Sequence, residues 1–144
     1  MTASIADPNL IVADELDNDV ELFTAWIDIH EYERVTLFLK GVRTGAPGDL
    51  TFVVEVSMDP ASKLNKTTPE SGLVSGDYDK LIDKGGSGAP VSNIVMSGAD
   101  GFRVVSFSPE DTIRTFRLGY KGETITDNTV TWTVDASYAG SARS

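Results

Sequence analysis

Hydrophobic and polar residues alternate in several stretches of the sequence, most regularly near its C-terminal end. There Trp132, Val134, Ala136 and Tyr138 are separated by single polar residues. Successive side chains of a β-strand point to opposite faces, so this period of two predicts a strand with one buried face. We therefore expect these four side chains, including the two aromatic ones, to point into a hydrophobic core.

Two further apolar runs, residues 33–43 and 49–58, lie on either side of a segment with two glycines and a proline, residues 44–48. In the second run the even-numbered residues are apolar as far as Met58. Glycine and proline are the residues that tight turns require. The pattern predicts a β-hairpin in which the two runs pair and the even-numbered residues of the second run are buried.

Turn residues separate eight runs of this kind, and no segment has a convincing helical period. The run at residues 20–29 differs from the others because apolar residues occupy both of its parities. This feature predicts a strand that is covered on both faces or that contacts a partner. The predicted strands are 9–13, 20–29, 33–43, 49–58, 92–97, 102–107, 112–120 and 129–138.

Residues 59–91 lose this periodicity and are rich in glycine, proline, serine, aspartate and lysine, which predicts a long mid-chain loop. Within it, residues 76–82 are expected to form a helical turn or a short strand. The whole pattern predicts an all-β fold, a jelly-roll-like sandwich of two antiparallel sheets with about eight strands. We expect residues 1–19 to be an acidic N-terminal arm with a first strand, residues 20–138 the sandwich, and residues 139–144 a C-terminal tail.

Charge is distributed unevenly along the 144 residues, whose formal net charge is −10. The first 33 residues contain nine acidic residues and no lysine or arginine, and the rest of the chain is almost balanced. An acidic field of this kind repels a phosphate backbone, so we expect no nucleic acid partner. Two interpretations remain open: the acids maintain solubility, or they dock the protein onto a basic surface.

Residues suited to catalysis or to metal binding are scarce. The chain has no cysteine and a single histidine, His30, which lies between acids in a predicted turn. Neither a nucleophile motif nor a phosphate-binding loop occurs, and the glycine-rich segment 85–88 lacks the lysine and helix such a loop needs. We expect no enzyme activity, no cofactor and no metal, although the acidic cluster at residues 14–19 leaves calcium as an alternative.

The apolar runs are too short to span a membrane, and the first ten residues lack the basic and apolar regions of an export signal. We therefore expect a protein made in a cytoplasm with no membrane partner. Aromatic residues leave one further alternative, a module that binds carbohydrate or a cell surface. Tyr78 in the long loop and Trp26 are the candidates for stacking on a sugar.

Three segments, AWIDIHEYERVTLFLKG, DLTFVVEVSMD and TVTWTVDASY, carry a resemblance. Together they resemble small β-sandwich virion proteins of tailed phages, such as capsid decoration proteins and head or tail accessory modules. The first two are also similar to discoidin-type sandwiches that bind sugars or lipids. The sequence departs from the discoidin pattern, because it lacks the cysteines and the closing Arg-Tyr-Val/Ile-Arg strand.

The phage resemblance implies a structural virion protein that stabilises a capsid without chemistry. Its partners would be the major capsid protein or other virion subunits, and it would form a homo-oligomer, with a trimer favoured. We expect the binding residues in the N-terminal segment and in the long loop. They are Leu10, Ile11, Val12, Asp14, Glu15, Asp17, Asp19, Tyr78 and Leu81.

Overall fold

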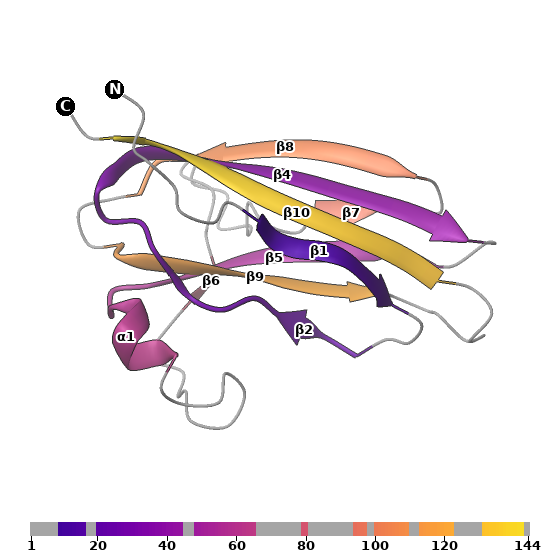
Figure 1. Cartoon of the computed structure of the whole chain (residues 1–144), viewed down its shortest axis with the longest axis horizontal. Helices are drawn as coiled ribbons and strands as arrows, with labels where there is room; N and C mark the ends of the chain where they lie inside the picture. Colours follow the sequence, from indigo (N-terminus) through magenta and orange to yellow (C-terminus); the bar gives the residue numbers. More distant parts are fainter. Residues whose placement is uncertain are drawn as a thin grey trace.

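The structure is a computed structural model that describes residues 9–16, 20–44, 48–65, 79–80, 94–97, 100–109, 113–122 and 131–142. These residues form two antiparallel sheets packed face to face and a short helix (Figure 1). The predicted all-β sandwich is therefore confirmed.

One sheet has four strands in the order β1-β10-β4-β8. Its centre is the long pair β10 and β4, which are matched residue for residue from Thr131 opposite Thr44 to Ser141 opposite Arg34. We call it the four-stranded sheet; its strands are β1 (Asn9–Leu16), β10 (Thr131–Ala142), β4 (Tyr32–Thr44) and β8 (Gly101–Phe107). Parts of the segments expected to be an arm and a tail, residues 9–16 and 139–142, are thus strands of this sheet.

The other sheet has six strands and is built on β5 and β9, which pair along their whole length. Two short strands, β2 and β3, share the free edge of β9, and another two, β6 and β7, share the free edge of β5. We call it the six-stranded sheet; its strands are β2 (Leu22–Phe23), β3 (Ile27–Asp28), β5 (Leu50–Ser57), β6 (Asp79–Lys80), β7 (Ile94–Met96) and β9 (Thr115–Gly122).

The pairing of strands has a regular order along the chain. The first strand pairs with the last, β2 and β3 pair with β9, β4 pairs with β8, and β5 pairs with β6 and β7. The first half of the chain, β1 to β5, therefore pairs with the second half, β6 to β10, in reverse order. Together the two halves form one long antiparallel ribbon, which is rolled up into the two sheets. This is the jelly-roll arrangement, with β2 plus β3 and β6 plus β7 each filling one of its eight strand positions.

The predicted hairpin of residues 33–43 with 49–58 is wrong. β4 and β5 belong to different sheets, and the chain crosses the sandwich between them. The two strands face each other across the core: a Cβ built on Gly41 would lie 2.5 Å from Cδ2 of Leu50. Met58 was also expected to be buried, but it lies just beyond the end of β5 and is exposed.

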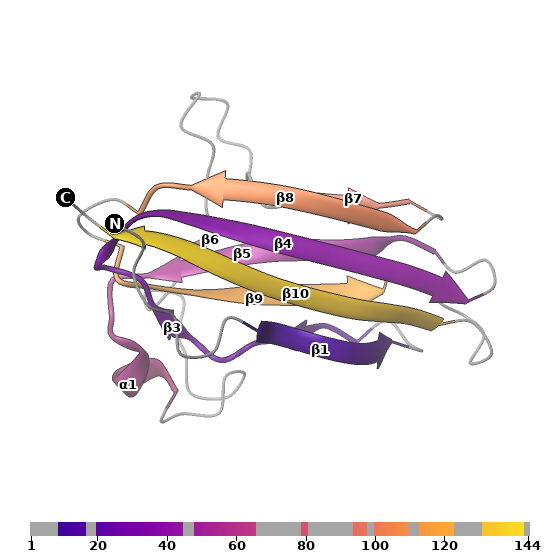
Figure 2. The ribbon, with the colours of Figure 1, turned by 45° about the horizontal axis from the view of Figure 1, so that its top comes forward.

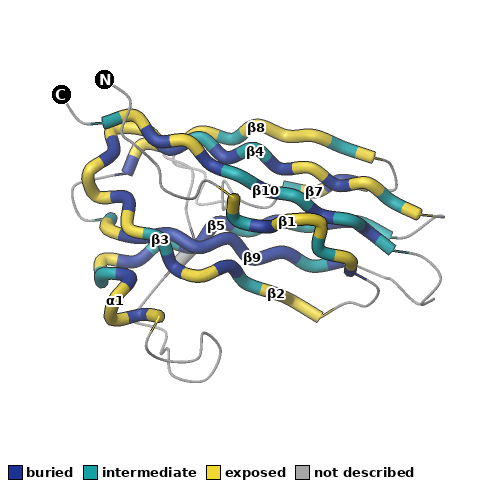
Figure 3. The backbone as a smooth tube through the Cα atoms, viewed as in Figure 1, coloured by how far each residue is buried: buried dark blue, intermediate teal, exposed yellow. Residues whose placement is uncertain are grey.

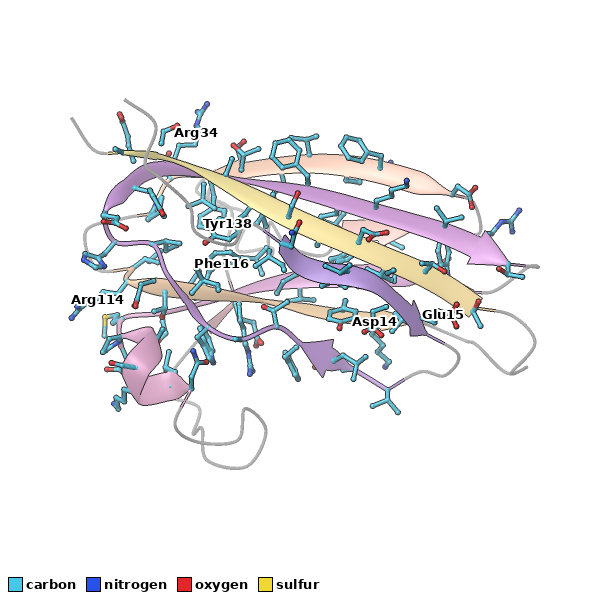
Figure 4. All side chains as sticks on the ribbon, viewed as in Figure 1. Asp14, Glu15, Arg34, Arg114, Phe116 and Tyr138 are labelled. Carbon is cyan, nitrogen blue, oxygen red and sulfur yellow. The ribbon has the colours of Figure 1, made fainter. Side chains whose placement is uncertain are left out.

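The core fills the space between the sheets, as Figure 3 shows by the buried lengths of β5 and β9. The alternation at the C-terminal end has the predicted effect, because Trp132, Val134, Ala136 and Tyr138 are all buried. The ring of Phe116 from β9 meets that of Tyr138 edge to face, with centroids 5.8 Å apart (Figure 4). Residues from both sheets thus interdigitate in one cluster.

A second, smaller core lies on the outside of the six-stranded sheet. There Trp26 packs with Ala61 and Leu64 of the helix α1 (Ala61–Leu64). The predicted strand at residues 20–29 is therefore two short strands interrupted at Thr24–Trp26. Its apolar residues occur on both parities because Ile29 is buried in the main core and Trp26 in the second core, whereas Val20 and Leu22 are exposed. No helix in the described parts of the chain is long and apolar enough to span a membrane.

Polar contacts lock this second core in place. The side chain of Asn65 accepts a hydrogen bond from the backbone N–H of Trp26 at 2.9 Å and donates one to the backbone carbonyl of Trp26 at 3.0 Å. Beneath it, Arg117 Nε lies 2.9 Å from Glu55 Oε1, and both side chains are buried. The Arg117 guanidinium also lies over the ring of Phe23, 3.9 Å from its centroid.

Candidate interaction surfaces

The structure divides the predicted N-terminal site residues between the core and the surface. Leu10 and Ile11 pack in or against the core, whereas the side chain of Val12 is 71% exposed. The register of β1 with β10 shifts on both sides of Ile11, which marks a β-bulge. Ala13 has a positive φ of 46°, and its N–H donates to Asp135 Oδ1 at 2.9 Å. The bulge therefore turns Val12 toward solvent.

Asp14 and Glu15 have different environments although they are adjacent (Figure 4). Asp14 Oδ2 accepts a hydrogen bond of 2.7 Å from the Tyr120 hydroxyl, whereas Glu15 is exposed. Burial, followed by the hydrogen bond to Asp14 and its charge, raises the pKa of Tyr120. Asp14 therefore joins β1 to the six-stranded sheet, and Glu15 is available to a partner.

Replacing Tyr120 with phenylalanine tests this link. The variant is expected to be less stable than the wild type by about 1–2 kcal/mol at pH 7, because Asp14 loses its hydrogen bond. Since folding raises the pKa of Tyr120, the unfolded chain releases this proton first, and the wild type loses stability as the pH rises above the usual value of 10.0. Urea unfolding at pH 7 to 11 should show that the difference in stability between the wild type and Tyr120→Phe becomes smaller as the pH rises. A difference that stays constant would contradict the hydrogen bond between Tyr120 and Asp14.

The remaining predicted site residues, Asp17, Asp19, Tyr78 and Leu81, lie outside the described residues. So does half of the acidic cluster at residues 14–19 that left calcium as an alternative. No group of three or more histidine, cysteine, aspartate or glutamate side chains suited to a metal occurs in the described part of the chain. His30 is exposed between β3 and β4. Trp26 is buried, so the expectation that it stacks on a sugar is wrong.

The first strands of the two sheets form an exposed margin of the sandwich, visible along β1 and β2 in Figure 1, and Figure 2 shows β1 at the edge of its sheet. β1 is an edge of the four-stranded sheet, and β2 lies at an edge of the six-stranded sheet. Apolar and acidic side chains are exposed there together. We call this surface the N-terminal edge; its residues are Glu15, Val20, Glu21 and Leu22.

A second exposed surface is the outward side of the four-stranded sheet. Phe102 and Val104 on β8 are 57% and 53% exposed. Register places them beside Lys40 and Phe38 of β4, which point the same way. We call this surface the outer face; its residues are Val12, Thr36, Phe38, Lys40, Val42, Phe102, Val104, Asp135 and Ser137.

An open groove of about 280 Å³ runs across the outer face between β1 and β8. Val12, Phe38 and Phe102 supply its apolar lining, and Lys40 and Asp135 are its charged groups. We had not predicted this surface from the sequence. A signal was present, because Phe102 and Val104 have one parity and Val105 and Phe107 the other, a pattern that indicates a strand with contacts on both faces.

No protein-family model matches the chain, and no curated protein matches its sequence. The two surfaces and the sequence pattern are therefore the basis for the function proposed next.

Proposed function

We propose that this protein is a non-enzymatic structural component of a tailed-phage virion, of the capsid decoration type. The observation that supports the proposal is the N-terminal edge, where exposed Val20 and Leu22 flank the acidic Glu21. A partner that covers this edge must present apolar patches and basic side chains. The excess of acid in the first 33 residues adds long-range attraction to such a surface.

Decoration would act through the number of contacts. One small edge gives a modest affinity. A particle carries many copies, and the stabilisation that they provide adds up. A jelly roll suits this role because its long paired strands make a stiff body whose edge residues keep their spacing. In this mechanism the protein binds neighbouring subunits and resists their separation, and no reaction takes place.

The test is rebinding of the purified chain to phage particles that lack it. The variant Glu15→Lys/Glu21→Lys reverses two charges on the N-terminal edge and should bind at least tenfold more weakly. The matched control is Glu31→Lys/Glu33→Lys, which makes the same change in net charge at exposed positions outside the edge. Equal binding by both variants would contradict docking through this edge, and absence of the wild-type protein from particles would contradict the virion role.

The groove in the outer face favours a second candidate, a module that binds carbohydrate. Phe38 and Phe102 offer apolar surfaces, and Asp135 and Ser137 offer hydrogen-bonding groups. A glycan array would test it: binding that is lost in Phe102→Ala supports the carbohydrate module, and an array without signal supports the structural role.

A further inference from the structure

We propose that the outer face binds a second copy of this chain in a twofold dimer, in place of the trimer that the phage resemblance implies. The proposal does not depend on the virion role, because it uses a different surface from the N-terminal edge. It is based on the charges of the outer face, on the order of residues across the four strands, and on the size of the face.

The outer face is electrically balanced although the protein is strongly acidic. Its charged residues are Lys40 and Asp135, whose charges cancel. The chain as a whole has a net charge of −10. Two copies therefore repel each other in most relative orientations. Contact through the outer face avoids most of this repulsion, because the charges on this face cancel. A strongly basic partner would instead be drawn to the acidic N-terminal edge.

One row of residues crosses the four strands of the outer face at a single height. This row is complementary to the same row read in the opposite direction. Phe102 pairs with Lys40, and Lys40 pairs with Asp135, so all three lie at the same height in the sheet. The bulged Val12 lies beside Asp135, because the N–H of the next residue bonds to the Asp135 carboxylate. The row therefore reads apolar, basic, acidic, apolar from β8 to β1.

The twofold axis of the dimer would run between the two facing sheets, parallel to the strands and midway between β4 and β10. A half-turn about this axis reverses the order of the row. It places Lys40 of one copy opposite Asp135 of the other, twice by symmetry, and places Phe102 opposite Val12. In this row apolar groups meet apolar groups and each charge meets its opposite, which is the self-complementarity that a twofold interface requires. Face-to-face packing of two sheets is itself a common arrangement.

The area of the face predicts a weak dimer. Four strands about 4.8 Å apart and about seven residues of 3.3 Å each cover roughly 19 by 23 Å. With side-chain relief, two such faces bury on the order of 1,000 Å², the lower limit for a specific interface. We therefore expect an equilibrium between one and two chains at micromolar concentrations, not a permanent assembly.

The experiment is sedimentation equilibrium of the full chain from about 1 µM to 1 mM, the range in which weak interfaces associate. The wild type should change from the mass of one chain to that of two. Lys40→Asp and Asp135→Lys should each remain monomeric, with dimerisation at least tenfold weaker. Mixed together, the two variants should form a heterodimer, because acid then faces base at both positions.

Circular dichroism of each variant checks that it is folded, since Asp135 also holds the bulge of β1. Arg114→Asp and Glu21→Lys are the matched controls: they make the same charge changes at exposed positions off the face and should dimerise like the wild type. A wild type that stays monomeric, a mass of three chains, or a mixture that stays monomeric would each overturn the proposal. The rebinding test of Glu15→Lys/Glu21→Lys fails or succeeds separately, so the two proposals can be told apart.

Discussion

Replacing Glu55 with alanine is expected to lower the free energy of unfolding by about 3–5 kcal/mol, because it removes the carboxylate that faces a buried guanidinium. Arg117 Nε lies 2.9 Å from Glu55 Oε1, and the Arg117 side chain is 2% exposed. Phe23 and Trp26 lie against the other side of this guanidinium, so water cannot replace the missing carboxylate. Urea unfolding followed by tryptophan fluorescence measures the loss.

The double variant Glu55→Leu/Arg117→Met is the control. It removes both charges and keeps apolar volume under Phe23 and Trp26, so it should be more stable than Glu55→Ala despite having two substitutions. If the double variant is instead the less stable of the two, the pair is a net source of stability and our account of Glu55 is wrong.

This ion pair also matters for the proposed docking surface. Arg117 holds Phe23 from below, and Thr24 forms a hydrogen bond in each direction with the backbone of Leu118. These contacts fix the segment that precedes the second core, and the exposed Val20 and Leu22 of the N-terminal edge belong to that segment. Loss of Glu55 should therefore weaken particle binding as well as stability.

Local sequence pattern was sufficient to predict the sandwich and much of its core. The period of two from Trp132 to Tyr138 predicts four inward side chains, and Trp132, Val134, Ala136 and Tyr138 are all buried. A strand with one buried face needs only alternate apolar residues. The pattern that predicts such a strand is therefore contained in a short stretch of sequence. The class of fold follows from several such stretches separated by turns.

The partner of each strand could not be predicted in this way. The segment between β4 and β5 has the glycines and proline of a hairpin turn, but these residues favour any sharp turn, including one that leads to another sheet. The outcome depends on distant parts of the chain: β4 pairs with β10 and β8, and β5 pairs with β9. Pairing between residues 34 and 141 is a long-range choice that no local turn encodes.

The surfaces show the same limit. Acidic and apolar residues near the N-terminus could be recognised as exposed candidates, but the sequence did not show that Ile11 is buried while Val12 is exposed, because the bulge in β1 decides it. The outer face was missed because its central row combines residues from four strands, and Phe102 and Asp135 become neighbours of Lys40 only through the register.

Replacing Trp132 with alanine is expected to cost about 3–5 kcal/mol of stability, because it leaves a cavity in the centre of the sandwich. The indole is fully buried, and its N–H donates to the Gly48 carbonyl at 3.0 Å. The ring also lies close to Gly41, where a Cβ would come within 3.1 Å of its Cε3 atom. Trp132 therefore packs against β4 and bonds to Gly48, which lies just before β5 of the opposite sheet begins.

Trp132→Phe separates the cavity from the hydrogen bond. Phenylalanine keeps most of the apolar contact and loses the bond to Gly48, so we expect a smaller cost of about 1–2 kcal/mol. Urea unfolding of both variants, with equal denaturant slopes, measures the difference. If the two variants lose the same stability, the bond to Gly48 outweighs the packing of the ring. In that case the crossing between the sheets, which local sequence does not encode, would depend chiefly on one hydrogen bond.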